Sequence, residues 1–200
     1  MPSLHLPKIR AVRTLATTRF FHIEAVDLTY ANGAEVTFER LMGQGAGAVL
    51  VVPITEAGEI VLIREYACGT ERYELGLPKG RIEGGEPILA AANRELMEEA
   101  GFGAKHLVFL RELTSAPAYS SQCTHVVLAM DLYPKRLPGD EPEPLDVVLW
   151  PFADLDQLAI HAECSEARSI AALYLARAYL TAERLAPVQN LPSGAPAHDE

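Results

Sequence analysis

The chain reads Gly80-Arg-Ile-Glu-Gly-Gly-Glu-Pro-Ile-Leu-Ala-Ala-Ala-Asn-Arg-Glu-Leu-Met-Glu-Glu-Ala-Gly-Phe102 in the stretch that decides its fold. Proline at a first helical position and glycine just past an end predict a helix over 87–100. In that helix Glu95, Glu98 and Glu99 have the spacing i, i+3, i+4 and share one side. Like charges on one stripe repel, and no Lys or Arg lies one turn C-terminal to them. A divalent cation would fill the gap.

Hard oxygen donors favour magnesium, which binds through a few carboxylates, waters and substrate phosphates. The stripe therefore points to phosphate-bond chemistry. The alternative is a solvated acidic face, and spacing alone does not separate the two.

The same stretch resembles the Nudix box, a pattern of glycine, glutamate, arginine and apolar residues at fixed spacing. The matching positions are Gly80, Glu86, Arg94, Glu95, Leu96, Glu98, Glu99, Gly101 and Phe102. The resemblance implies an α/β Nudix fold, an α-β-α sandwich with a mixed sheet. It also implies hydrolysis of a nucleoside diphosphate linked to another moiety.

Composition agrees with one compact unit and narrows its partners. The chain has 200 residues, 49% of them hydrophobic, and a net charge of −10. This charge argues against nucleic acid or an anionic membrane as a partner, because both need a basic face. Three widely spaced cysteines disfavour a disulfide framework or a zinc site. Without a signal peptide or a membrane-length apolar run, we expect a cytoplasmic protein.

The chain divides into three predicted parts. Aromatic and β-branched residues over 20–30 and 34–41 flank Asn32-Gly33 and predict a two-residue turn in an N-terminal antiparallel hairpin, within a subdomain over 1–45 to which the family resemblance assigns dimerisation. Residues 46–185 form the predicted catalytic domain, and 186–200 a flexible tail. The strands predicted after the hairpin cover 48–54, 60–63, 73–75, 107–113, 124–132 and 147–150, and a last helix covers 166–185.

Stretches outside the box resemble the ADP-ribose pyrophosphatase branch of the Nudix family, and most closely its bacterial members that act on ADP compounds. They include 63–71, 73–76, 131–134, 139–145 and 166–168. This likeness implies magnesium-dependent hydrolysis of ADP-ribose, diadenosine polyphosphates and NADH. It also implies a homodimer whose N-terminal strands help to build the partner's site.

The box supplies the metal ligands. Glu95 and Glu99 are the expected direct ligands of Mg²⁺, for which Mn²⁺ may substitute, and Glu98 is a further or shared ligand. The resemblance adds the backbone carbonyl of Lys79. Arg94 is expected to orient a box glutamate through a bidentate pair. Glu86 is expected to support the loop or a secondary metal.

The attacking water needs a base, and the proline-rich loop over 137–144 can supply one. The resemblance places Glu141 and Glu143 near the catalytic glutamate of these pyrophosphatases, with Glu141 slightly preferred. The alternative is that both, with Asp140, are solvated loop charges.

Substrate contacts are less sharply indicated. Arg40, Arg64, Arg72 and Arg81 could clamp phosphates, although an isolated arginine is usually a surface charge. Tyr119 could stack on adenine or be an ordinary core or surface tyrosine.

Three functions stay open at this point. They are a hydrolase of ADP-linked compounds, a Nudix pyrophosphatase for another sugar nucleotide or dinucleotide, and a silent binding module. The intact box carboxylates disfavour the third, because a silent module gains nothing from their repulsion.

Overall fold

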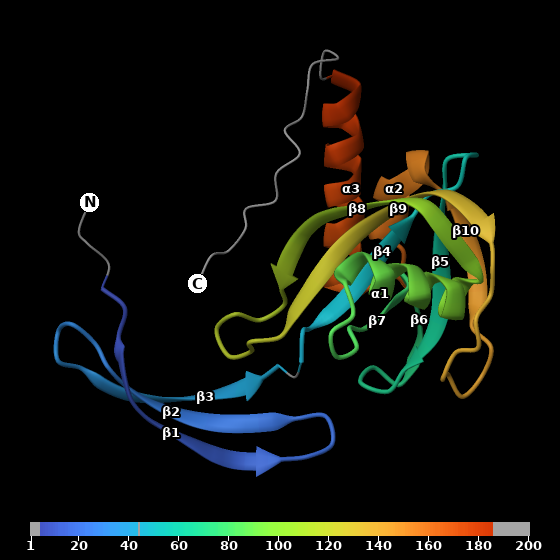
Figure 1. Ribbon diagram of the computed structural model, residues 1–200. Helices are drawn as coiled ribbons and strands as arrows, with labels where there is room; N and C mark the ends of the chain where they lie inside the picture. The colour runs from blue at the N-terminus through green and yellow to red at the C-terminus, as the bar shows by residue number, and fades with distance from the viewer. Residues whose placement is uncertain (1–4, 44, 186–200) are drawn as a thin grey trace.

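The computed structural model describes residues 5–43 and 45–185 (Figure 1). The predicted tail over 186–200 and Gln44 of the predicted hairpin end lie outside these residues. The strands are β1 Lys8–Thr17, β2 His22–Thr29, β3 Glu35–Met42, β4 Ala48–Pro53, β5 Glu59–Ala67, β6 Arg72–Gly76, β7 Lys79–Arg81, β8 Phe102–Thr114, β9 Cys123–Pro134 and β10 Asp146–Pro151. The helices are α1 Ile88–Glu95, a π-helical turn Leu96–Ala100, a 3₁₀ turn Phe152–Asp154, α2 Leu155–Ala159 and α3 Ala167–Leu185.

Strand β4 lies between two hydrophobic layers. Leu50 and Val52 pack in one cluster with Leu173 of α3, whereas Val49 and Val51 pack in another with residues of α1. Successive side chains of a strand point to opposite faces, so one strand serves both layers. The helices therefore cover opposite faces, as Figure 1 shows for green α1 and red α3. This confirms the predicted α-β-α sandwich.

Residues 46–185, the predicted catalytic domain and hereafter the catalytic part, contain two sheets. One has the order β7-β4-β9-β8 and the other β10-β5-β6. Strands β4 and β9 are parallel, and β4 with β7 and β8 with β9 are antiparallel, so the first sheet is mixed. Every strand predicted after the hairpin is present, while the short β7 was not predicted.

The N-terminal unit is a three-stranded sheet of order β1-β2-β3, not a two-stranded hairpin. Strand β1 escaped prediction because two irregularities, between Ile9 and Ala11 and between Thr14 and Ala16, break its alternation of apolar and polar residues. The turn after β2 is also wider than predicted. The amide of Gly33 donates to the Tyr30 carbonyl at 2.9 Å, and Gly33 has a φ of 82°.

This N-terminal sheet stands beside the catalytic part (Figure 1). It is attached through the end of β3, where the Leu41 amide donates to the Tyr119 carbonyl at 2.7 Å and the Ser121 amide donates to the Leu41 carbonyl at 3.0 Å. Within the described residues, no helix is both long and apolar enough to cross a membrane.

Candidate active site

The box carboxylates gather in a cleft with a volume of about 880 Å³. Its walls come from β7, from the end of α1 with its π turn, and from the loop after β9. The acidic and basic residues lining it are Lys79, Arg81, Glu83, Arg94, Glu95, Glu98, Glu99, Asp140 and Glu141. The structure therefore brings the predicted metal ligands together with one of the two predicted bases.

The box helix changes its winding where the carboxylates lie. Helix α1 ends at Glu95, and the chain continues as a π turn from Leu96 to Ala100. Gly101 then ends the turn with a left-handed φ of 75°, as predicted. Pro87 precedes the first helical residue rather than occupying it, and its carbonyl accepts from the Ala90 amide at 2.9 Å.

Glycine at position 80 makes room for Glu95. A Cβ atom at Gly80 would lie 2.1 Å from the carboxyl carbon of Glu95. A side chain would fit there only if the Glu95 carboxylate moved, so glycine lets the backbone of β7 lie directly against this carboxylate. This contact holds Glu95 at the bottom of the cleft, where only 8% of the residue is exposed.

Glu99 is the second buried carboxylate. It is 6% exposed, and its Oε2 accepts a hydrogen bond from the Lys79 amide at 2.8 Å. Burial raises the pKa of Glu99 to about 8, and the nearby charges of Glu95 and Glu65 add to this shift. Lys79 thus contacts the box through its N–H, and the predicted ligand role of its carbonyl stays a prediction.

The carboxylates fit a hard divalent cation. Burial also raises the pKa of Glu95, with repulsion from Glu98 and Asp140 acting in the same direction. Two buried carboxylates that resist ionisation near each other are stabilised when a cation lies between them. Oxygen donors at such a place match magnesium or manganese.

Arg94 organises three of the box glutamates. Its Nε and Nη2 donate to the two carboxylate oxygens of Glu86, each at 3.0 Å. Its Nη1 donates to Glu95 at 2.8 Å and to Glu98 at 2.9 Å, and Nη2 also donates to the Arg81 carbonyl at 3.0 Å. This is the bidentate role predicted for Arg94. No Lys or Arg lies one helical turn C-terminal to the box glutamates, and Arg94 supplies the neighbouring positive charge instead.

The two candidate bases lie in different surroundings. Glu141 lines the cleft, and burial raises its pKa, as do the charges of Glu65 and Asp140. Glu143 instead accepts a hydrogen bond from the Tyr73 hydroxyl at 2.7 Å. Of the two, only Glu141 therefore lines this cleft together with the box glutamates.

Three of the four predicted substrate arginines are paired with carboxylates. Arg40 donates to Glu24 at 2.8 Å, Arg64 to Glu163 at 3.1 Å, and Arg72 to Glu74 at 2.7 Å. None of the three lines the carboxylate cleft, whereas Arg81 does. Their contact with substrate stays a prediction.

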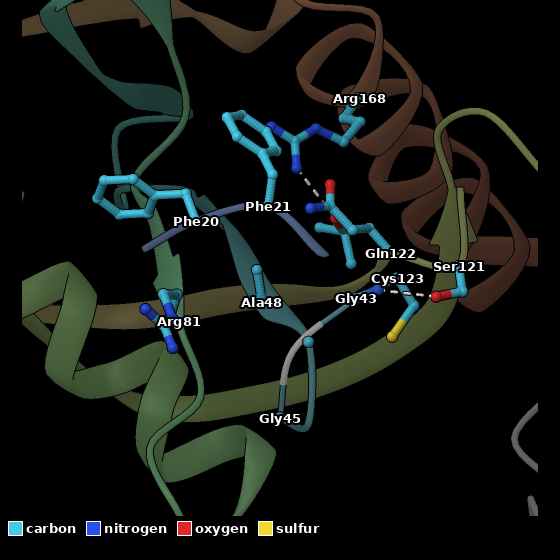
Figure 2. A pocket seen from close by; sticks show the side chains of 12 residues that line it. Phe20, Phe21, Gly43, Gly45, Ala48, Arg81, Ser121, Gln122, Cys123 and Arg168 are labelled. Atoms are coloured by element: carbon cyan, nitrogen blue, oxygen red, sulfur yellow. Dashed lines mark hydrogen bonds between the residues drawn. The ribbon is translucent and has the colours of Figure 1, made fainter. Parts of the chain in front are cut away.

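Tyr119 is 57% exposed and lies where the N-terminal sheet meets the catalytic part, outside the lining of the cleft. Two other aromatic residues were not predicted. Phe20 and Phe21, from the turn between β1 and β2, line a second pocket with Arg81 and Arg168 (Figure 2). This pocket shares Gly45 and Arg81 with the cleft and offers aromatic faces for a planar ring.

Sequence reasoning also missed Glu65. Its carboxylate accepts from the Lys79 ammonium at 2.6 Å, and its charge acts on both Glu99 and Glu141. The available signal was a carboxylate two residues after the buried apolar run of strand β5. That signal is weak, because strands often end in charged residues.

Comparison with known proteins agrees with this geometry. Residues 46–173 match the model of the NUDIX domain, and residues 7–40 match that of the NudE-type Nudix hydrolase N-terminal domain. The chain is 49% identical to the ADP compounds hydrolase NudE of Escherichia coli, over 89% of this chain and 95% of that protein. It is 28% identical to the ADP-ribose pyrophosphatase of Bacillus subtilis, over 80% and 90% of the two chains.

A solved structure is similar as well. A crystal structure of an ADP compounds hydrolase superimposes with a TM-score of 0.86 at 48% identity, covering 92% of this chain and 98% of the other. The fold and the family predicted from the box are thereby confirmed.

Proposed function

Since the chain belongs to the Nudix hydrolase family, we propose that it cleaves the pyrophosphate bond of ADP-linked compounds and releases AMP. The observation that carries this proposal is that Glu95, Glu98 and Glu99 line one cleft, in a chain that resembles an ADP compounds hydrolase along most of its length. ADP-ribose, diadenosine polyphosphates and NADH are the substrates we propose. From ADP-ribose, the second product is ribose 5-phosphate.

Glu95, Glu98 and Glu99 would hold Mg²⁺, or Mn²⁺ in its place. Such an ion neutralises the diphosphate, polarises the attacked phosphorus and lowers the pKa of a bound water. Arg94 keeps Glu95 and Glu98 in position, and the Lys79 amide does the same for Glu99. The protein thus fixes the carboxylates before any substrate arrives.

Glu141 acts as the general base in this proposal. Its pKa is raised toward neutral pH. A general base works best when its pKa lies near the working pH, because it is then still ionised and also accepts a proton readily. The proton of the attacking water moves to a Glu141 oxygen while the new P–O bond forms. The leaving phosphate carries away the electron pair of the bridging P–O bond.

The cleft also offers positive charge for the diphosphate. Lys79 and Arg81 line it, and Arg81 has no acidic partner closer than 4.0 Å among the described residues. Because the whole chain carries a net charge of −10, a phosphate ligand depends on such local cations. For the adenine ring we propose the Phe20–Phe21 pocket beside Arg81.

We propose a homodimer formed through the N-terminal sheet. Its β1 and β3 expose apolar side chains in rows across β2. Val12, Val26 and Phe38 are register partners, as are Ile9, Leu28 and Val36. Phe38 is 45% exposed and Ile9 60% exposed, so much of this apolar face lies open in the single chain. A second copy would cover it.

The three cysteines are unpaired, as is usual in a reducing compartment. We therefore propose a cytoplasmic enzyme that meets its nucleotides there.

The test is product analysis by mass spectrometry in water enriched with heavy oxygen. ADP-ribose, a diadenosine polyphosphate, NADH and a UDP-sugar are compared with Mg²⁺ present. We expect AMP from the three adenine compounds and slow turnover of the UDP-sugar, and the labelled product identifies the phosphorus attacked. Preferred turnover of the UDP-sugar would instead support a pyrophosphatase for other sugar nucleotides, and no turnover of any compound would contradict the proposal.

A further inference from the structure

We propose that Glu112, Cys123 and His125 form a zinc-binding site separate from the carboxylate cleft. One donor atom from each of the three side chains lies within 4.8 Å of the others. None of them lines the cleft that holds the box glutamates.

The sheet places these side chains together. Strands β8 and β9 pair antiparallel with Glu112 opposite His125, and Cys123 precedes His125 by two residues on β9. Residues two apart on a strand point to the same face, and direct cross-strand partners do as well. All three side chains therefore project from one face of the sheet without any special loop conformation.

His125 presents a nitrogen that lacks a hydrogen bond. The residue is 9% exposed, and its Nδ1 has no hydrogen-bond partner among the described residues. The other nitrogen, Nε2, lies 3.1 Å from the Ala46 carbonyl and must carry a proton to bond with it. Neutral Nδ1 then offers a lone pair, the form in which imidazole binds a metal.

The neighbouring donors are close to Nδ1 and Nε2. The Glu112 Oε2 lies 3.8 Å from Nδ1, where the ion would bind. The Cys123 sulfur lies 3.9 Å from Nε2, the nitrogen that donates to Ala46, so the thiol must turn toward Nδ1 to reach the same ion as Glu112. A thiolate, an imidazole and a carboxylate are the ligands that zinc takes in proteins, and three of them leave a fourth position for water. Mg²⁺ prefers oxygen donors alone, so the two sites differ in the metal they select.

The surroundings leave a path for an ion. Cys123 lines the pocket with Phe20 and Phe21, where Figure 2 shows its sulfur, and Glu112 is exposed. Gly47 packs against Cys123 so closely that a Cβ atom there would lie 2.7 Å from the sulfur.

The test uses Co²⁺ as a spectroscopic substitute for zinc, with excess Mg²⁺ present to occupy the carboxylates. Full-length protein is kept reduced with a phosphine. We expect a thiolate-to-cobalt charge-transfer band that one equivalent of Zn²⁺ removes. The band should be absent in Cys123→Ser and present in Cys68→Ser, a matched control because Cys68 is an exposed thiol elsewhere. Circular dichroism checks that each variant is folded.

Glu112→Gln should weaken zinc binding by at least about tenfold. Affinity typically falls by about 10- to 100-fold even when the lost residue only hydrogen-bonds to a metal ligand, and a direct ligand should matter at least as much. Calorimetric titration with Zn²⁺ in the same Mg²⁺ buffer measures this change. A wild-type protein without the cobalt band, a band that survives in Cys123→Ser or vanishes in Cys68→Ser, or unchanged affinity in Glu112→Gln would overturn the three-residue site.

Discussion

The buried carboxylate of Glu99 links metal binding to the stability of the fold. Its pKa of about 8 lies far above the ordinary value of 4.5 because the side chain is buried. The folded protein therefore binds a proton that the unfolded chain releases at lower pH. Metal binding relieves this cost by giving the charged form a partner.

The first prediction concerns pH and stability without metal. As pH rises from about 5 to 8, the Glu99 contribution should lower the free energy of unfolding by at most about 1.4 kcal/mol per pH unit, and it should level off above pH 8. Glu99→Gln removes this titration but keeps an acceptor for the Lys79 amide. Urea unfolding of chelator-treated protein across that range measures the difference in slope. Parallel curves for the two proteins would show that Glu99 titrates normally.

A second prediction concerns the close approach of β7 to Glu95. Gly80→Ala should push the Glu95 carboxylate away from its place and lower turnover by about 10²-fold, the cost of a displacement near 1 Å. Steady-state kinetics with ADP-ribose measure the change. Gly69→Ala is the matched control, because a Cβ atom there meets nothing within 4 Å. Equal activity in the two variants would mean that the cleft tolerates a shifted Glu95.

At the residue scale, sequence spacing was enough to group Glu95, Glu98 and Glu99, because all three lie within five residues of one helical segment. The role of Arg94 followed from the family resemblance. Spacing could not reveal the contact between Gly80 and Glu95 or the influence of Glu65. Both depend on strands β5 and β7 meeting the helix in three dimensions.

At the scale of elements, the loop after β9 places its two glutamates, Glu141 and Glu143, in different surroundings. Glu141 faces the cleft, while Glu143 holds the Tyr73 hydroxyl of β6. Glu141 is thus the residue that we propose as the base, whereas Glu143 attaches the loop to the neighbouring sheet.

The third prediction follows from this division. Glu141→Gln should lower turnover by about 10²- to 10⁴-fold, the usual contribution of a general base, and remove the acid limb of the pH–rate profile. Glu143→Gln should have a much smaller effect and keep that limb. Tyr73→Phe, which removes only the hydroxyl that Glu143 accepts from, should behave like Glu143→Gln. A larger loss in Glu143→Gln than in Glu141→Gln would reverse the assignment.

Element prediction succeeded where hydrophobic runs were long and failed where the pattern was broken. The core strands β4 and β5 read as apolar runs and were found in place. Strand β1 is exposed along its whole length and irregular in register, so no periodic pattern marked it. The π turn of the box likewise has no sequence signal in helical spacing.

At the scale of the whole molecule, the N-terminal sheet leaves an apolar face exposed to solvent. Among the residues that the structure describes, no helix covers its strands, and the sheet contacts the catalytic part mainly through the end of β3. A partner copy would bury this face and bring its own N-terminal strands near the cleft.

The fourth prediction tests this interface. Val12→Lys places a charge on the apolar row and should convert the proposed dimer to monomers. Ala11→Lys is the matched control on the same strand, because Ala11 pairs with Asp27 and points to the opposite face. Light scattering after size-exclusion chromatography gives the mass of each variant. A wild-type monomer, or a dimer that survives Val12→Lys, would place the interface elsewhere.

The hydrogen bonds of Arg94 bear on whether the enzyme needs a metal ion in order to fold. Because the Arg94 guanidinium already offsets the negative charges of the neighbouring glutamates, we expect the chain to fold without a bound metal ion. Stripping divalent cations should silence hydrolysis while far-ultraviolet circular dichroism stays unchanged, and restoring Mg²⁺ should revive it within the same sample. The concentration of divalent cation would then control the activity of the folded enzyme and not its folding.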